Sequence, residues 1–264
     1  MEIDTIIQGD CLKVMKSFPD KSVDLVVTSP PYDNLRIYHG YTFDFEGIAQ
    51  QLYRIVKVGG VVVWVVGDAT INGSETGTSF KQALYFKEIG FNLHDTMIWD
   101  KKSCRYPETN RYYPVFEYMF VLSKGAPETF NPFQDRKNIY TGSKVARKKQ
   151  MRKTNGEMLE NSAYRNDKDR RIKNYGVRFN VWRIDVSATE GEKEHPATFA
   201  LDLARDHILS WSNEGDLVLD PMCGSGTTCV AAKRLRRHWI GIEISEKYCD
   251  LARRRVVATQ EPMF

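Results

Sequence analysis

The chain has 264 residues, of which 42% are hydrophobic and 27% are charged, so it fits one large α/β domain or a domain with an insertion. It has no apolar run of membrane-spanning length and no signal-peptide pattern at its start, which predicts a cytoplasmic protein with no membrane partner. Five scattered cysteines without paired zinc spacing indicate reduced thiols and no metal site.

The net charge of +4 is unevenly distributed along the chain. Residues 135–178 carry 14 Lys or Arg against 5 Asp or Glu, whereas the rest of the chain carries 24 basic against 29 acidic side chains. This distribution predicts a mildly acidic body with one basic lobe that faces a polyanion. A solvated loop without a partner is the alternative.

The first 124 residues predict alternating strands and helices. Apolar and β-branched runs predict strands over 4–8, 23–27, 61–66, 93–99 and 115–122. Helical spacing of apolar residues predicts helices over 11–18, 45–56 and 79–89, and Gly59-Gly60 is expected to end the second of these. Loops are expected over 69–77 and 100–114.

Periodicity fails between residues 125 and 190 and returns afterwards. In this stretch aromatic side chains lie among basic ones, a composition that fits phosphate neutralisation together with base or sugar contact. The sequence then predicts helices over 197–211, 227–237 and 245–258, strands over 216–220 and 239–244, and a glycine loop over 221–226.

The segment Thr28 to Tyr32 (Thr-Ser-Pro-Pro-Tyr) directly follows a buried strand. Two prolines fix the backbone and remove two donors, so the strand is expected to end in a stiff turn. That turn would hold a hydroxyl, carbonyls and an aromatic ring at the carboxyl edge of the sheet, where ligands bind in open α/β folds. An ordinary proline turn at a strand end is the alternative.

A second segment, Leu217 to Thr228, has the pattern strand, glycine loop, helix. Its glycines allow close backbone approach to a ligand, and a helix start offers free N–H donors. Glu243, 23 residues after Asp220, ends the next strand, where an acid usually binds ribose hydroxyls. The dinucleotide fingerprint is incomplete, so a general nucleoside site is predicted; a NAD site or a structural turn are the alternatives.

In this order the two segments resemble the β group of amino-methylating DNA methyltransferases, which use S-adenosylmethionine. Three further segments match it: Gly9 to Leu12, Phe116 to Lys124 and Glu194 to Ala197. The resemblance implies a Rossmann-like, seven-stranded methyltransferase sheet in permuted motif order with an inserted basic recognition lobe. Residues 1–124 would form the catalytic half, 125–190 the inserted DNA target-recognition region, and 191–264 the cofactor-binding half.

The resemblance also implies a cofactor site for S-adenosylmethionine. Asp10 would accept a hydrogen bond from the adenine beside the backbone of Cys11, and Glu243 would hold the ribose hydroxyls. Asp220 would lie near the methionine portion and His195 near its carboxylate, although a plain helix-entry role for His195 is equally compatible. The other implied cofactor-binding residues are Thr28, Met222, Cys223, Gly224, Ser225, Gly226 and Thr227.

The catalytic residues implied by the resemblance are Ser29, Pro30, Pro31 and Tyr32. Acceptors at the two N–H groups of an exocyclic amine favour a pyramidal nitrogen, and Ser29 Oγ and the Pro30 carbonyl could be these acceptors. The two prolines would preorganise them, and Tyr32 would stack on a base flipped out of double-stranded DNA. The reaction needs no metal and no covalent intermediate.

In the resembling family, serine at the position of Ser29 is usual for N4-cytosine enzymes. The sequence therefore predicts a sequence-specific N4-cytosine methyltransferase, with N6-adenine as the alternative; C5 methylation is excluded because no cysteine has a Pro-Cys context. We expect a restriction–modification role with a cognate endonuclease at the same site, and a monomer or homodimer. An RNA or protein amide methyltransferase and a DNA-binding module without catalysis are further alternatives.

Overall fold

A computed structural model of the protein describes residues 1–31, 43–102, 109–144, 150–152, 157–160, 171–186 and 200–260. The chain divides into two compact units. Unit 1 comprises Met1–Asn131 and Asn180–Phe264, and unit 2 comprises Pro132–Phe179. Among the described residues, no helix has both the length and the apolar character needed to cross a bilayer.

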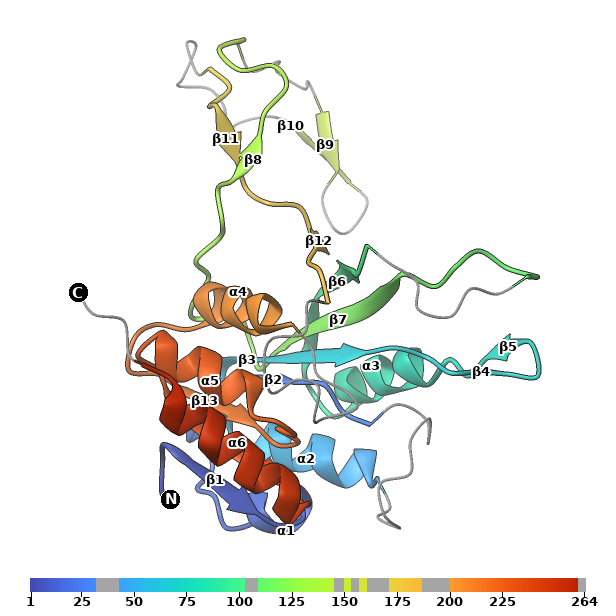
Figure 1. Ribbon diagram of the computed structural model, residues 1–264. Helices are drawn as coiled ribbons and strands as arrows, with labels where there is room; N and C mark the ends of the chain where they lie inside the picture. The colour runs from blue at the N-terminus through green and yellow to red at the C-terminus, as the bar shows by residue number, and fades with distance from the viewer. Residues whose placement is uncertain are drawn as a thin grey trace. The chain divides into compact units, whose positions relative to one another are not determined.

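Unit 1 is built on one eight-stranded sheet (Figure 1). Every neighbouring pair is parallel except those of β7, which runs antiparallel to both β3 and β6. The strand order is β1 (Thr5–Gln8), β14 (His238–Glu243), β13 (Leu217–Asp220), β2 (Val23–Thr28), β3 (Val56–Val66), β7 (Phe116–Ser123), β6 (Asn92–Asp100) and β12 (Val181–Arg183). The C-terminal strands β13 and β14 thus lie between the N-terminal strands β1 and β2, as the permuted order predicts.

All seven strands predicted from the sequence are present, and β12 adds an eighth at the edge of the sheet. β12 pairs in parallel with β6, with Trp182 opposite Trp99. The Trp182 side chain is buried in the core, and Trp99 Nε1 donates to the Ile184 carbonyl at 2.8 Å. A three-residue strand inside a polar stretch is too short for its periodicity to be seen in the sequence.

Helices cover both faces of the sheet (Figure 1). Strand β3 shows why two layers are needed, because Val61, Val63 and Val65 belong to one core cluster and Val62, Trp64 and Val66 to the other. One cluster is covered by α1 (Cys11–Met15), α2 (Phe45–Ile55) and α3 (Thr78–Glu88), and the other by α4 (Leu201–Trp211), α5 (Thr227–Arg234) and α6 (Glu246–Ala258).

Two local predictions in the first half of unit 1 are wrong. Helix α2 ends at Ile55 and not at Gly59, because Val56 is already extended and begins β3. Gly59 instead adopts φ +85° within β3, where its N–H donates to the Lys124 carbonyl at 2.7 Å. The expected loop over 69–77 contains a hairpin of β4 (Thr70–Ile71) and β5 (Ser74–Glu75). Its Asn-Gly turn has positive φ at both residues, which is the usual signal for such a hairpin.

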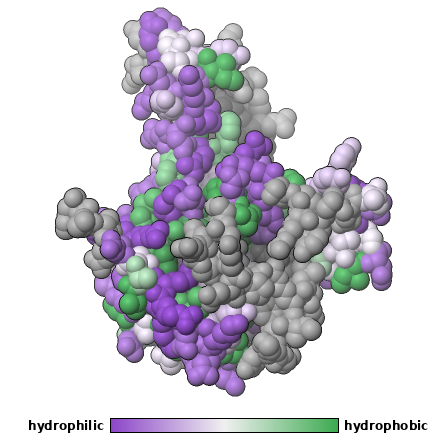
Figure 2. All heavy atoms as spheres, in the orientation of Figure 1, coloured by the Kyte–Doolittle hydropathy of each residue, from purple (hydrophilic) through white to green (hydrophobic). Residues whose placement is uncertain are grey.

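Unit 2 is made of short antiparallel strand pairs. These are β8 (Arg136–Lys137) with β11 (Tyr175–Gly176), and β9 (Gln150–Arg152) with β10 (Met158–Glu160). The described side chains between 132 and 144 and between 171 and 179 are all half-buried or exposed. Figure 2 shows mainly hydrophilic side chains on the visible described surface of this unit. Unit 2 lies within the stretch 125–190 in which periodicity fails, and a unit this poor in buried apolar surface leaves little periodicity to detect.

Candidate functional site

Five parallel strands of unit 1 end at one edge of the sheet, which we call the site edge. Thr28 ends β2, Asp220 ends β13 and Glu243 ends β14, while Asp10 follows β1 within two residues. The carboxyl edge of an open parallel sheet is where ligands bind in α/β proteins. The Ser-Pro-Pro segment and the glycine loop are therefore neighbours, although they lie at opposite ends of the chain.

A buried hydrogen bond joins these two segments directly. Thr28 Oγ1 donates to Asp220 Oδ1 at 2.8 Å, and both side chains are almost fully buried. A second bond runs the same way, because Thr228 Oγ1 donates to the Val27 carbonyl at 3.1 Å. The backbone that carries Ser29 and Pro30 is thus held in fixed register with the glycine loop.

Asp220 is an anionic group with unusual surroundings. Burial raises the pKa of its carboxyl to about 6, while hydrogen bonds from Thr28, Thr228 and the Met222 N–H oppose this rise. These hydrogen bonds favour the ionised carboxylate against the cost of its burial. A carboxylate at this edge suits a ligand that carries a positive group.

Glu243 combines partial burial with two backbone hydrogen bonds. Its Oε2 accepts from the Gly224 N–H and its Oε1 from the Ser245 N–H, each at 2.9 Å. Burial raises the pKa of this carboxyl, and these two bonds oppose the rise. A carboxylate has about four acceptor positions, so each oxygen retains capacity for one ligand hydroxyl. The arrangement fits the two hydroxyls of a ribose.

Asp10 caps helix α1, and its Oδ1 accepts from the Leu12 N–H at 2.9 Å. The Gly9 N–H donates to the Glu243 carbonyl at 2.9 Å, and β1, which precedes Asp10, pairs with β14, which ends at Glu243. Burial raises the pKa of the Cys11 thiol to about 12, which leaves it protonated and unsuited to nucleophilic attack. Asp10 and Glu243 therefore offer two neighbouring acceptors, as a bound nucleoside requires.

The glycine loop is shaped by its own packing. Gly224 and Gly226 have φ of +51° and +80°, and a Cβ on Gly226 would lie 2.9 Å from Ala252 Cβ. Gly226 therefore allows α5 to approach α6 closely. Because Gly226 precedes α5 without a side-chain cap, the N–H groups of the helix start remain suited to a ligand.

Four other predicted cofactor residues have partners inside the protein. Ser225 and Thr227 are buried, and Arg255 Nη1 donates to the Ser225 carbonyl and to Ser225 Oγ, both at 2.7 Å. The Cys223 side chain is buried in the same core cluster as Cys229, and Met222 packs half-buried against the opposite cluster. Their direct contact with a cofactor stays a prediction.

Ser29 and Pro31 are half-buried and Pro30 is buried, directly after the end of β2. Tyr32 and His195 lie outside the described residues. Their predicted roles, like that of Ser29, stay predictions.

Sequence reasoning missed Asp68, which follows β3 at the site edge. Its carboxylate accepts from the Ser79 N–H at 2.9 Å and from the hydroxyls of Ser79 and Thr76. These bonds hold the start of α3 beside β3. The signal was present, because Gly67-Asp68 ends an apolar strand much as Asp220 ends another.

The opposite edge of the sheet holds a cavity of about 590 Å³ next to Asp4, His238 and Arg253. Two of its basic side chains bind the ends of helices: Lys233 Nζ donates to the Val256 carbonyl at 3.0 Å, and Arg237 Nη1 donates to the Leu235 carbonyl at 2.7 Å. This cavity is remote from the segments that carry the chemistry.

Two candidate ligand segments are joined at one edge of a parallel sheet, and carboxylates that could accept from a nucleoside lie beside them; this arrangement fits an α/β enzyme that brings a nucleoside-type cofactor to a second substrate. Comparison with known proteins identifies which one. Residues 23–254 match the family model of the DNA methylases that modify N6 or N4 amines, so the chain belongs to this family. The family depends on S-adenosylmethionine, and the cofactor predicted from the sequence is confirmed at that level.

Individual relatives agree with this assignment. The chain is 55% identical over 242 residues to the orphan methyltransferase M.BamHII of Bacillus amyloliquefaciens, covering 90% of this chain and 89% of that one. The solved structure of the cytosine-N4-specific PvuII DNA methyltransferase is 21% identical, with a TM-score of 0.66 over 95% of this chain and 85% of that one. M1.HpyAVI, solved as a SAM complex, is also 21% identical, with a TM-score of 0.62 over 96% and 98%. These two structures confirm the predicted methyltransferase fold.

Proposed function

We propose that this chain transfers the methyl group of S-adenosylmethionine to the exocyclic N4 amine of a cytosine flipped out of double-stranded DNA. The observation that carries the proposal is the 2.8 Å hydrogen bond from Thr28 to Asp220. It ties the strand end that bears Ser29 and Pro30 to the loop that fits the cofactor. Two substrates bound to these segments would meet at the site edge.

On the cofactor side, Glu243 would accept from the ribose hydroxyls and Asp10 from the adenine amine. Gly224 would let the backbone approach the cofactor, and His195 would lie near the methionine carboxylate. Asp220 would place a negative charge near the sulfonium. When bound, S-adenosylmethionine would supply an electrophilic methyl group and leave as S-adenosylhomocysteine, while the methylated amine would release one proton to solvent.

On the base side, Ser29 Oγ and the Pro30 carbonyl would each accept one N–H of the exocyclic amine. Both hydrogens are then held on one side, and the lone pair is directed to the other, so less free energy is needed to pyramidalise the nitrogen. Pro30 and Pro31 keep these acceptors in place, and Tyr32 would stack on the flipped base. Positioning of the two substrates would supply much of the acceleration.

The choice of cytosine rests on Ser29, because serine at this position is usual for N4-cytosine members of the family. Methylation of the N6 amine of adenine needs the same two acceptors, so it is the second candidate. The family match covers both reactions.

We assign DNA recognition to residues 125–190, and the catalytic and cofactor-binding halves to 1–124 and 191–264. Support comes from the charge, because 14 of the basic residues lie between 135 and 178 against 5 acidic ones. A cognate endonuclease at the same site, cytoplasmic action and a monomeric or homodimeric state complete the proposal. M.BamHII is named an orphan methyltransferase, so this relative offers no support for the endonuclease.

The test is a labelled-methyl competition. The protein is incubated with methyl-labelled S-adenosylmethionine and equal amounts of duplex DNA, RNA and a protein extract, and modified nucleosides are identified by mass spectrometry. The proposal predicts labelled N4-methylcytosine in the DNA. Labelled N6-methyladenine would overturn the choice of base, and label confined to RNA or protein would overturn the choice of substrate.

A further inference from the structure

We propose that the β8–β11 strand pair in unit 2 contacts DNA through Lys137, Lys173 and Tyr175, whereas Arg136 and Arg178 hold this strand pair together and do not contact DNA. This inference rests on the proposed function, because it sorts the cations of the recognition region by role. It divides side chains that the sequence alone leaves equivalent.

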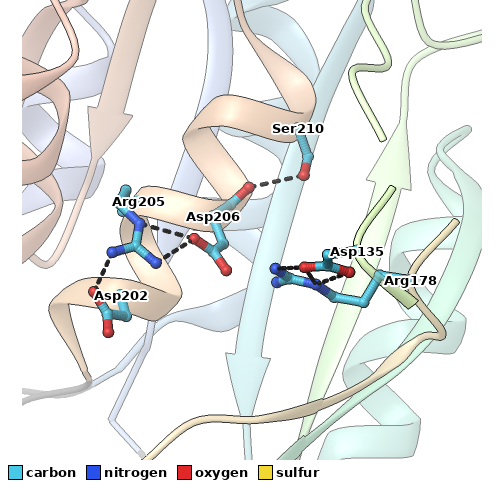
Figure 3. Close-up of polar contacts among 6 residues, drawn as sticks. All are labelled: Asp135, Arg178, Asp202, Arg205, Asp206 and Ser210. Carbon is cyan, nitrogen blue, oxygen red and sulfur yellow. Dashed lines mark hydrogen bonds and ion pairs between the residues drawn. The ribbon is translucent and has the colours of Figure 1, made fainter. Parts of the chain in front are cut away.

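Arg178 is occupied by partners within unit 2. Its Nε donates to Asp135 Oδ2 at 2.9 Å and to Oδ1 at 3.2 Å, and its Nη2 donates to Oδ2 as well (Figure 3). The Phe133 ring lies 4.2 Å from the guanidinium carbon, and the Arg178 N–H donates to the Phe133 carbonyl at 2.9 Å. A guanidinium neutralised by a forked carboxylate and stacked on an aromatic ring is poorly suited to bind a phosphate.

Arg136, on β8, also has partners within unit 2. Its Nε donates to the Val177 carbonyl at 2.9 Å, and its guanidinium carbon lies 4.4 Å from the Phe179 ring centre. Gly176, which pairs with Arg136, explains the close fit, because a Cβ there would lie 2.5 Å from Arg136 Nη2. The guanidinium thus lies directly over Gly176.

The other face of the β8–β11 strand pair has a different character. Lys137 pairs with Tyr175, so these two side chains share a face. Lys173 lies two residues before Tyr175, just outside β11. All three side chains are exposed, Tyr175 by 52%. Within the described part of the chain, neither lysine ammonium has a hydrogen bond or ion pair. An exposed aromatic ring close in the chain or across the strand pair to two such cations fits a base or sugar contact combined with phosphate neutralisation.

Salt dependence distinguishes the two roles. A lysine that neutralises a phosphate of B-DNA contributes about 0.9 to the slope of log K against log salt. Binding of this 264-residue chain to a mixed-sequence DNA duplex is measured across a salt series, and hydrogen exchange of residues 132–179 is measured in parallel. Lys16→Gln is the matched control, because this exposed lysine follows α1 at the edge opposite the site.

We expect Lys137→Gln and Lys173→Gln each to lower the slope by about 0.9 with unchanged exchange protection, and Lys16→Gln to change neither. Arg178→Gln and Arg178→Lys should both keep the slope and lose exchange protection of the β8–β11 strand pair. Lysine retains the charge but cannot donate to the Asp135 carboxylate through two nitrogens. The inference is overturned if the lysine variants keep the wild-type slope. It is also overturned if Arg178→Gln lowers the slope with protection intact.

These outcomes are separable from failure of the proposed function. A protein that binds DNA with the expected lysine dependence but produces no methylated nucleoside would refute only the function. A protein that methylates DNA with unchanged slopes in both lysine variants would refute only the inference.

Discussion

Units 1 and 2 use polar side chains in opposite ways. At the site edge of unit 1, Thr28, Asp220 and Glu243 are buried or nearly so, and each already has hydrogen-bond partners within the protein. In unit 2 the ion pair of Asp135 and Arg178 stabilises the β8–β11 strand pair, while Lys137 and Lys173 are exposed. Catalysis needs groups fixed in advance, whereas binding to a phosphate chain needs exposed charge. Each prediction below tests one side of this contrast.

The largest effect is expected at Ser29. Ser29→Ala removes one of the two proposed acceptors and should lower kcat by about 100-fold, as loss of one preorganised hydrogen-bonding group typically does. The affinity for S-adenosylmethionine, measured by calorimetry, should stay within about twofold, because Ser29 belongs to the base side. Full activity in Ser29→Ala would show that the hydroxyl is not an acceptor in the reaction.

Gly226 tests whether the glycine loop is fixed by packing. Gly226→Ala should reduce the free energy of unfolding by more than 2 kcal/mol, about 1–2 of which comes from the positive φ. The rest comes from the clash with Ala252. Gly77→Ala is the matched control, because Gly77 also precedes a helix with positive φ but has nothing within 4 Å of its Cβ position. Equal losses in urea unfolding of the two variants would contradict the role assigned to Ala252.

Thr28→Val tests the bond between the two segments. It leaves the buried Asp220 carboxylate short of one donor and should lower the free energy of unfolding by about 1–3 kcal/mol. Cofactor affinity should fall with it, since the loop loses its register. Thr28→Ser keeps the hydroxyl and should recover both quantities. Identical behaviour of the Val and Ser variants would mean that the hydrogen bond does not hold the site.

The smallest effect concerns a buried histidine in unit 1. Complete burial lowers the pKa of His207 to about 3, and its ring stacks on Trp182 at 4.6 Å. The unfolded chain takes up this proton below about pH 6.5, so the free energy of unfolding should fall by about 1 kcal/mol between pH 6 and pH 5. His207→Phe keeps a stacked ring and should lose this contribution. If the free energy of unfolding fell equally with pH in wild type and His207→Phe, the contribution assigned to His207 would be contradicted.

The sequence predicts those parts of the fold that have a regular hydrophobic pattern or a strong turn-forming residue. Long apolar strands such as 61–66 and the glycine loop at Gly224 and Gly226 were predictable, because local physics dictates them. Strand β12 was not, since Trp182 is buried by its tertiary neighbours and not by a local pattern. The β4–β5 hairpin was not predicted, although Asn72-Gly73 is a usual sequence signal for such a turn.

The two segments of the candidate site were predictable from the sequence, but the contact between them was not. No pattern shows that Thr28 donates to Asp220, because their contact depends on β2 pairing with β13. Likewise, Arg136 and Lys137 are equivalent in sequence, and only the strand register with Gly176 and Tyr175 separates them.

The most direct measurement is the nucleoside content of DNA from a methylation-deficient bacterial host that expresses this chain. Enzymatic digestion and mass spectrometry would compare wild type with Ser29→Ala. We predict N4-methylcytosine in the DNA of cells with wild type and its near absence with Ser29→Ala at equal protein levels. DNA without any methylated exocyclic amine, from cells that contain the folded protein, would contradict the central claim.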